Sequence, residues 1–407
     1  MAAEPEDNWA WLGLLKWSLT YVDGTVPSED SPDFQQMSEE DKKFLEEVMQ
    51  NGVINEGDRL KTILNQCVAY LDSIKDDGKK EPVDGESAAA QVNQNEEENS
   101  NPIPSEEEVK ELLQEVQDII GQIDFAKSFA AIGGIPFLIG CASQTNTVPQ
   151  SVRAACLAVL GTLCQNNPSV QYTMLEQGNI PKLINIFFAE YVNGVSNGNG
   201  DSSSPVQVRA VQAMSCFIRN HDVAEKIFCM NQEGKKMINC ALGIYSQTQE
   251  STQTNGLPLP APSTSLRSKA LFFLQALLTS DSSDQERIRF FTDPIQYVAT
   301  HFLDPNMEAD SNIRETALSM LTRIMDQKKS INAILDVKNS LVGLGVKRVA
   351  EMRALEGEEK DYVEEELRLW EKLITEVARG IRDESNPDTQ APLAIAAGEP
   401  NLEPLAE

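Results

Sequence analysis

Residues 152–167 read VRAACLAVLGTLCQNN, and three later stretches of the chain superpose on them. With Arg153, Gln207, Arg267 and Arg314 as position zero, the residue three positions on is always small. The residues four, seven, ten and eleven positions on are apolar or cysteine. These offsets place the side chains on one stripe of an α-helix. The four stretches therefore predict four equivalent amphipathic helices that pack closely at the small residue.

A second apolar segment follows each of these helices. The first of these segments contains a break at Gly178 and Pro181, which predicts the end of one helix and the start of another. The four anchors are 54, 60 and 47 residues apart, and the two longer intervals contain polar inserts around 192–205 and 247–265. Without the inserts the period is roughly 40–47 residues, the range of armadillo and HEAT repeats. We therefore expect an all-α, armadillo/HEAT-like right-handed superhelical solenoid with flexible N- and C-terminal segments.

The composition changes on both sides of the repeats. An Asp-, Glu-, Asn- and Ser-rich stretch before the repeats has too few apolar residues to fold alone. The predicted organisation is a flexible Trp-rich segment at 1–30, two flanking helices at 31–75, a disordered acidic linker at 76–105, armadillo-like repeats at 106–350, a C-terminal capping helix at 351–380 and a disordered acidic tail at 381–407.

The charge balance excludes several classes of partner. Among 407 residues, 34 are Lys or Arg and 63 are Asp or Glu, which gives a net charge of −29. A nucleic-acid binder would show a basic stripe, and an anionic membrane would repel this chain. The apolar run Trp9–Leu19 is too short to span a bilayer. The seven cysteines form no C-x-x-C pair, which is typical of a reducing compartment. We expect a monomeric, cytoplasmic protein that binds neither nucleic acid nor membrane.

Motifs of catalysis are missing from the sequence. The two histidines, His221 and His301, have no metal-ligand spacing around them, and there is no phosphate-binding P-loop and no G-x-S-x-G elbow. The carboxylates stand in runs that are typical of solvated surface. We therefore expect no catalytic residue, no metal and no cofactor, and interpret the chain as a protein that binds other proteins.

Two features are candidates for partner binding. Basic and amide residues recur at equivalent repeat positions, and they could form a binding ridge or could cap helices and tie repeats together. They are Arg153, Asn166, Asn167, Arg219, Asn220, Arg267 and Arg314. The second feature is the N-terminal aromatic segment, which could dock onto its own array or onto a partner's apolar groove. Its apolar residues are Trp9, Trp11, Leu14, Leu15, Trp17 and Leu19.

Several stretches resemble one known family. Arg209–His221 (RAVQAMSCFIRNH), Val152–Asn167 and Ile123–Ile139 (IDFAKSFAAIGGIPFLI) resemble the repeats of the armadillo-type nucleotide exchange factors of the 70-kDa heat-shock chaperone, the Hsp70-binding protein / Fes family. The last stretch is similar to the family's D-N-A-x-x-F-x-x-x-G-G helix, with Phe125 in place of the usual Asn. The flanking stretches Leu14–Leu19, Ser38–Met49 and Asp361–Ile374 also look like their counterparts in the family.

The resemblance implies a cochaperone. Family members grip lobe II of the chaperone's nucleotide-binding domain, which releases ADP, and their N-terminal segment helps to expel the client. Ala126 matches a small residue at that contact, and Arg267 matches a basic residue that faces the partner. Arg219 and Asn220 match an Arg-Asn pair whose role could equally be structural. Two alternatives stay open: an importin-like carrier of basic peptides, although residues 120–360 contain no Trp, and a general scaffold.

Overall fold

The computed structural model describes residues 43, 55–77, 103–197, 203–244, 261–327, 334 and 336–385, and every regular element among them is helical. The chain divides into two units, residues 1–63 and 64–407. Of the first unit only Lys43 and the start of α3 (Glu56–Asp77) are described. The predicted segment at 1–30 lies outside the described residues, as do residues 78–102 of the linker predicted at 76–105 and residues 386–407 of the tail predicted at 381–407. All the repeats belong to the second unit, to which the following description refers.

Each repeat consists of three successive helical segments, of which the first is short, as in armadillo proteins. The first comprises α5 (Ile123–Ala131), α6 (Gly134–Ala142) and α7 (Gln150–Cys164), and the second α8 (Pro168–Glu176), α9 (Asn179–Asn197) and α10 (Pro205–Ile218). The third comprises α11 (Asp222–Cys229), α12 (Gln232–Leu242) and α13 (Thr264–Thr279). The fourth comprises α14 (Gln285–Phe290), α15 (Thr292–Tyr297) with the π-helix η2 (Val298–Phe302), and α16 (Ser311–Asp326). Helix α4 (Glu106–Ile119) precedes them, and α18 (Lys338–Arg353) and α19 (Glu358–Ser385) follow.

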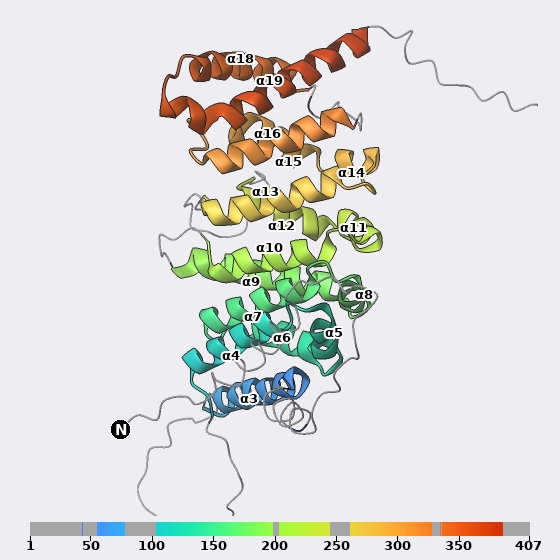
Figure 1. Cartoon of the computed structure of the whole chain (residues 1–407), viewed down its shortest axis with the longest axis vertical. Coiled ribbons are helices and arrows are strands. Elements are labelled where there is room, and N and C mark those ends of the chain that lie inside the picture. The colour runs from blue at the N-terminus through green and yellow to red at the C-terminus, as the bar shows by residue number, and fades with distance from the viewer. Residues whose placement is uncertain are drawn as a thin grey trace, which may run out of the picture. The chain divides into compact units, whose positions relative to one another are not determined.

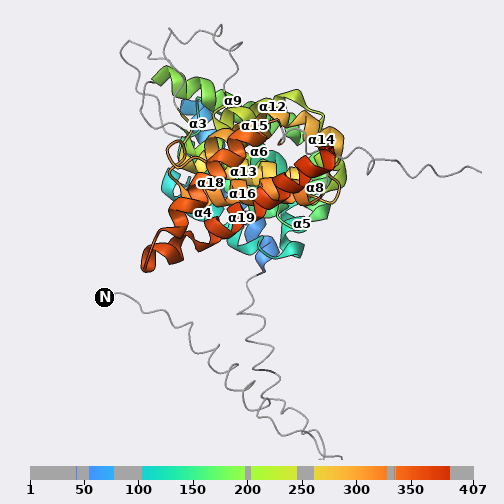
Figure 2. The same ribbon diagram turned by 90° about the horizontal axis from the view of Figure 1, so that it is seen from above.

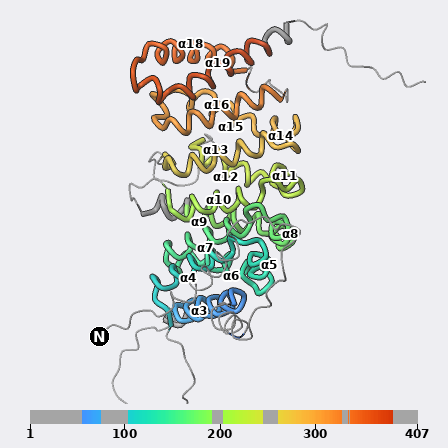
Figure 3. The backbone as a smooth tube through the Cα atoms, in the orientation of Figure 1, coloured from blue at the N-terminus to red at the C-terminus, as the bar shows by residue number. Residues whose placement is uncertain are grey.

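The third helix of each repeat, together with α4 before the repeats and α19 after them, forms a continuous row, which we call the ladder. Along it α4, α7, α10, α13, α16 and α19 each pack against the next (Figure 1). Seen along the stack, α13, α16 and α19 overlie one another (Figure 2). The backbone trace changes colour steadily from one end of the stack to the other, so repeats adjacent in sequence are adjacent in space (Figure 3). The predicted all-α armadillo-like fold is confirmed.

The predicted apolar stripe is the core of this stack. Every small or apolar residue that the four aligned stretches place on the stripe is buried, with at most 5% of its surface exposed. The small residues at the third offset are Cys156, Ala210, Ala270 and Ala317, each 0% exposed. The α5–α6 break also follows from its sequence. Gly133 has a left-handed φ of 98°, and a Cβ on Gly134 would lie 2.3 Å from the Phe129 ring.

Three local features differ from the sequence interpretation. The apolar segment Ala224–Tyr245 is two helices, because Asn231 caps α12 by accepting a hydrogen bond from the Gly234 N–H. The segment Arg287–Phe302 is likewise divided into α14, α15 and η2. In the predicted flanking helix that is α3, Val68 shares an apolar stripe with Leu60 and Leu64 at four-residue spacing. Val68 is nevertheless 40% exposed, because Cys67 and Tyr70 take the buried positions.

Candidate functional site

The middle of the ladder contains no acidic residue. Helices α7, α10 and α13 have 15, 14 and 16 residues and not one Asp or Glu, although acids make up 63 of the chain's 407 residues. At the start of the ladder, α4 opens with Glu106, Glu107 and Glu108. We call the solvent-facing side of α7, α10 and α13 the acid-free ladder. Its composition is opposite to that of the chain as a whole, which points to a binding surface for an acidic partner.

Cations stand on this side of the ladder without acidic partners. Arg209 lies on α10, Arg219 caps its C-terminus, Lys269 lies on α13 and Arg323 on the adjoining α16. Among the described residues, none of the four forms an ion pair, and Arg209 bonds only to the Gln212 side chain, at 2.8 Å. Surface ion pairs are abundant elsewhere in the described part of the chain. These four charges are therefore available to an external partner.

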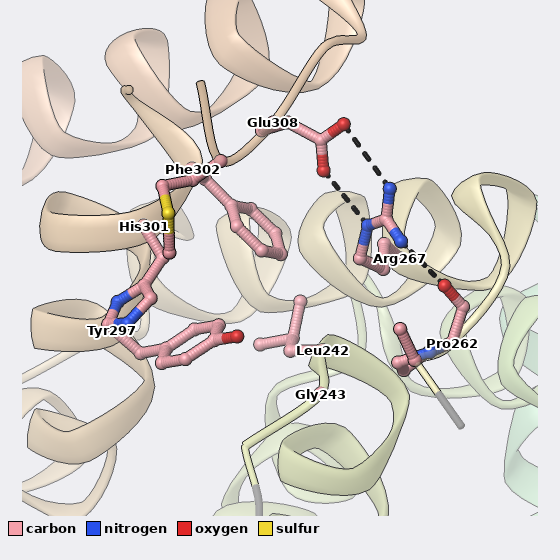
Figure 4. A pocket seen from close by; sticks show the side chains of 10 residues that line it. Leu242, Gly243, Pro262, Arg267, Tyr297, His301, Phe302 and Glu308 are labelled. Carbon is pink, nitrogen blue, oxygen red and sulfur yellow. Dashed lines mark hydrogen bonds and ion pairs between the residues drawn. The ribbon is translucent and has the colours of Figure 1, made fainter. Parts of the chain in front are cut away.

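The three arginines at position zero, unlike these four cations, form ion pairs with glutamates. Arg153 Nη1 lies 2.5 Å from Glu190 of the next repeat, Arg267 Nε lies 2.9 Å from Glu308, and Arg314 Nη2 lies 3.0 Å from Glu366 of α19. Arg153 is 2% exposed and Arg314 is 7% exposed. Figure 4 shows the Arg267–Glu308 pair in the wall of a pocket of about 250 Å³, with Arg267 also donating to the Pro262 carbonyl. These ion pairs tie successive repeats together, one of the two roles that the sequence left open. Direct contact of these arginines with a partner stays a prediction.

The amide residues form equivalent turns between repeats. Asn166 follows α7 with a φ of 52°, and Asn220 follows α10 with a φ of 59°. Asn167 then caps α8, while His221 Nδ1 caps α11 by accepting the Ala224 N–H at 3.2 Å. Asn tolerates the left-handed conformation better than most residues. The recurrence of these amides is therefore explained by the turn, and Asn166 and Asn220 are exposed at its tip.

The remaining predicted site residues are buried or outside the described residues. Ala126 lies on α5 with 2% of its surface exposed. Trp9, Trp11, Leu14, Leu15, Trp17 and Leu19 of the predicted client-release segment lie outside the described residues. Their predicted roles stay predictions.

Sequence reasoning missed an aromatic side chain on the acid-free ladder. Phe272 of α13 is 46% exposed, and the guanidinium of Arg219 stands 4.8 Å from its ring centroid. On the other side of the same turn, Tyr172 of α8 stacks with His221 at 6.4 Å. Phe272 sits five positions after the Arg267 anchor, an offset outside the buried stripe, and that offset is the signal that could have identified it.

The part of the chain that the structure describes holds no cluster of metal-ligating side chains. No group of three or more His, Cys, Asp or Glu there could hold a metal. No single described helix is long and apolar enough to cross a membrane, and only the bent pair α5–α6, with 75° between its helices, passes that test jointly. The seven cysteines are free and buried.

Comparisons with known proteins give one family match and several similar solved structures. The family described as SIL1/FES1/HPBP1 C-terminal domain matches residues 125–239, from α5 into α12. A search of curated proteins finds no match. Solved structures similar to the chain include a designed armadillo repeat protein (12% identity, 69% of this chain and 96% of that one, TM-score 0.45). An engineered protein (14% identity, 67% and 92%, TM-score 0.44) and the armadillo repeats only protein from Plasmodium falciparum (12% identity, 67% and 98%, TM-score 0.38) are also similar.

The matched domain supplies α7 and α10, two of the three acid-free helices, and the turns that carry Asn166 and Asn220. It also contains the three repeat stretches on which the sequence resemblance was based. Residues 125–239 are thus similar to the SIL1/FES1/HPBP1 C-terminal domain, in agreement with the resemblance that the sequence indicated.

Proposed function

We propose that this chain binds the nucleotide-binding domain of a cytosolic 70-kDa heat-shock chaperone through the acid-free ladder, promotes ADP release and assists release of the client. The family domain at residues 125–239 supports the exchange activity. The observation that carries the choice of surface is the absence of Asp and Glu from α7, α10 and α13 in a chain of net charge −29. Such a surface attracts an acidic face of the partner and repels a basic one.

Exchange requires no catalytic side chain. A protein that binds the open, nucleotide-poor state of the chaperone more tightly than the closed state shifts the population toward the open state. The shift is large only if the binding surface keeps its shape. The buried ion pairs between repeats, such as Arg153–Glu190 and Arg314–Glu366, support such a shape because each links a ladder helix to a neighbouring repeat.

The finer parts of the proposal follow from the family resemblance. Lobe II of the nucleotide-binding domain is the proposed contact, the chain acts as a monomer, and the segment 1–30 with its three tryptophans assists client release. A carrier of basic peptides is the poorer alternative, because basic cargo would meet the unpaired Arg209, Arg219 and Lys269. No described observation favours a scaffold over an exchange factor.

The test is stopped-flow release of fluorescent ADP from a cytosolic 70-kDa heat-shock chaperone. We expect the full chain to accelerate release in a saturable way, and Lys269→Glu with Arg323→Glu to weaken that effect. The matched control is Lys347→Glu on α18, which also reverses an exposed lysine, 70% exposed, but outside the ladder. If the folded wild-type chain leaves ADP release unchanged, the proposed activity is wrong. If the double variant and the control behave like wild type, the activity stands and the choice of surface is wrong.

A further inference from the structure

We infer that Arg219, held against Phe272, is a preorganised receptor for a carboxylate of the bound partner. The inference rests on the proposed function only for the identity of that partner. It assigns to one side chain of the acid-free ladder a specific chemistry, two-point binding of an Asp or Glu. The backbone, the side chain and the surroundings of Arg219 each contribute to the argument.

The backbone at Arg219 is fixed from three directions. Its N–H donates to the Ser215 carbonyl at 3.1 Å as the C-cap of α10. Its carbonyl accepts from Gln171 Nε2 at 2.9 Å, and Gln171, which is 2% exposed, belongs to α8 of the same repeat. The next residue, Asn220, is in the left-handed region and donates its N–H to buried Glu225 at 3.2 Å. The direction of the Cα–Cβ bond of Arg219 is therefore set by α10 itself, by α8 of the same repeat and by α11 of the next repeat.

The side chain is also held, with the Cys216 thiol beside it, but it has no carboxylate partner among the described residues. Arg219 Nε donates to the Ser215 carbonyl at 3.3 Å, and the guanidinium stands over Phe272 at 4.8 Å. Among the described residues no oxygen atom accepts a hydrogen bond from Nη1 or Nη2. By contrast, each guanidinium of Arg153, Arg287 and Arg314 forms an ion pair with a buried glutamate. Arg219 thus has the ordered position of those arginines without their counter-charge.

The surroundings select the ligand. The two Nη groups of an arginine match the two oxygens of a carboxylate, and stacking on an aromatic ring leaves that edge of the guanidinium accessible. A side chain already held in its binding position loses less conformational entropy when the ligand arrives. Neither α10 nor α13 carries an acid that could compete, while Arg209 and Lys269 add positive charge. An Asp or Glu on the partner's surface is the ligand that this arrangement fits.

A partner-independent test uses Arg side-chain NMR. In the full chain labelled with ¹⁵N-arginine, the Nε–H signal of Arg219, assigned by its loss in Arg219→Lys, is followed during titration with a hexaglutamate peptide. We expect it to shift at lower peptide concentration than the signals of Arg209 and Arg323, and Phe272→Leu to abolish that preference. A shift no larger than those of the two other arginines would overturn the inference.

A second test uses the chaperone itself. Arg219→Lys keeps the charge and the helical fold but removes the paired Nη groups that would bind two carboxylate oxygens. We therefore expect the dissociation constant for the isolated nucleotide-binding domain to rise at least tenfold. The matched control, Arg353→Lys on α18, replaces an arginine whose side chain is 64% exposed outside the acid-free ladder, and it should change the constant less than twofold. If wild type binds and Arg219→Lys binds equally well, the inference is wrong while the proposed function stands. If wild type does not bind, the proposed function is wrong, and the hexaglutamate titration alone tests whether Arg219 is a carboxylate receptor.

Discussion

Replacing Glu225 with alanine should destabilise the repeat array more than any surface change. Glu225 is 1% exposed on α11, and its Oε2 lies 2.7 Å from each of three donors: Ser280 Oγ, Ser282 Oγ and Arg287 Nη1. Arg287 belongs to the next repeat and is 7% exposed. In Glu225→Ala its charge would stay buried without a counter-ion. Breaking a buried pair in this way costs about 3–5 kcal/mol of unfolding free energy.

The same change also leaves the Asn220 N–H without its acceptor, Glu225 Oε1 at 3.2 Å. Loss of this part-buried hydrogen bond adds roughly 1 kcal/mol. Removing both charges in Glu225→Ala/Arg287→Ala should cost much less than the sum of the single variants, because no unpaired charge remains. The two residues contact each other, so this non-additivity is the expected sign of a direct pair.

The assay is urea unfolding followed by far-ultraviolet circular dichroism, with hydrogen exchange of α11 and α14. Exchange is needed because repeat arrays do not always unfold in a single step. The control is Glu233→Ala on neighbouring α12, whose partner Lys236 lies 3.6 Å away at the exposed surface, and it should cost under about 0.5 kcal/mol. A loss in Glu225→Ala below about 1 kcal/mol, or an additive double variant, would refute the reasoning.

Three further predictions concern acid, packing and thiol reactivity. Burial disfavours the charged form of Glu366, but hydrogen bonds from Arg348 and Arg314 outweigh it, so its pKa lies below 4.5. The stability that Glu366 contributes is therefore fully present above the pKa of the unfolded state and is lost as pH falls through the lower pKa of the folded state. Glu366→Gln should consequently flatten the acid limb of a plot of Tm against pH. Gly134→Ala should cost about 1–3 kcal/mol in urea unfolding, since its Cβ would meet the Phe129 ring and carbonyl, whereas Gly140→Ala has nothing within 4 Å and should be tolerated. Burial raises the pKa of Cys67 and Cys229 to about 12, so native chain at pH 8 should react with a thiol reagent far more slowly than chain in urea; equal rates would contradict this.

The long helices could be predicted from sequence because burial imposes a period. Each ladder helix has to place a small residue and four apolar ones against its neighbours, so these positions recur in the four aligned stretches and are all buried. The short first helices were harder to predict. Helices α11 and α14 have only 8 and 6 residues, and they begin at the caps His221 and Asp284 rather than at a point that a periodic pattern marks.

The candidate site was only partly predictable, because the partners of its side chains lie far away along the chain. Arg153, Arg267 and Arg314 meet carboxylates 37, 41 and 52 residues further along the chain. No local pattern marks Glu190, Glu308 or Glu366 among 63 acidic residues. The recurrence of arginine was visible in the sequence, but whether each one was paired could not be read from it. The Arg219–Phe272 contact, which joins two repeats 53 residues apart, was hidden for the same reason.

Position on the ladder helix decides what an arginine does in this fold. At position zero the side chain points into the junction with the next repeat, where burial makes a glutamate partner necessary, as for Arg153 and Arg314. Two positions later, at Arg209 and Lys269, and at the C-cap position of Arg219, the side chain stays on the solvent-facing side. The buried pairs hold the repeats in register, and that register fixes the spacing of the free cations. An exchange factor needs this combination, because only a surface of fixed spacing can discriminate between two shapes of its partner.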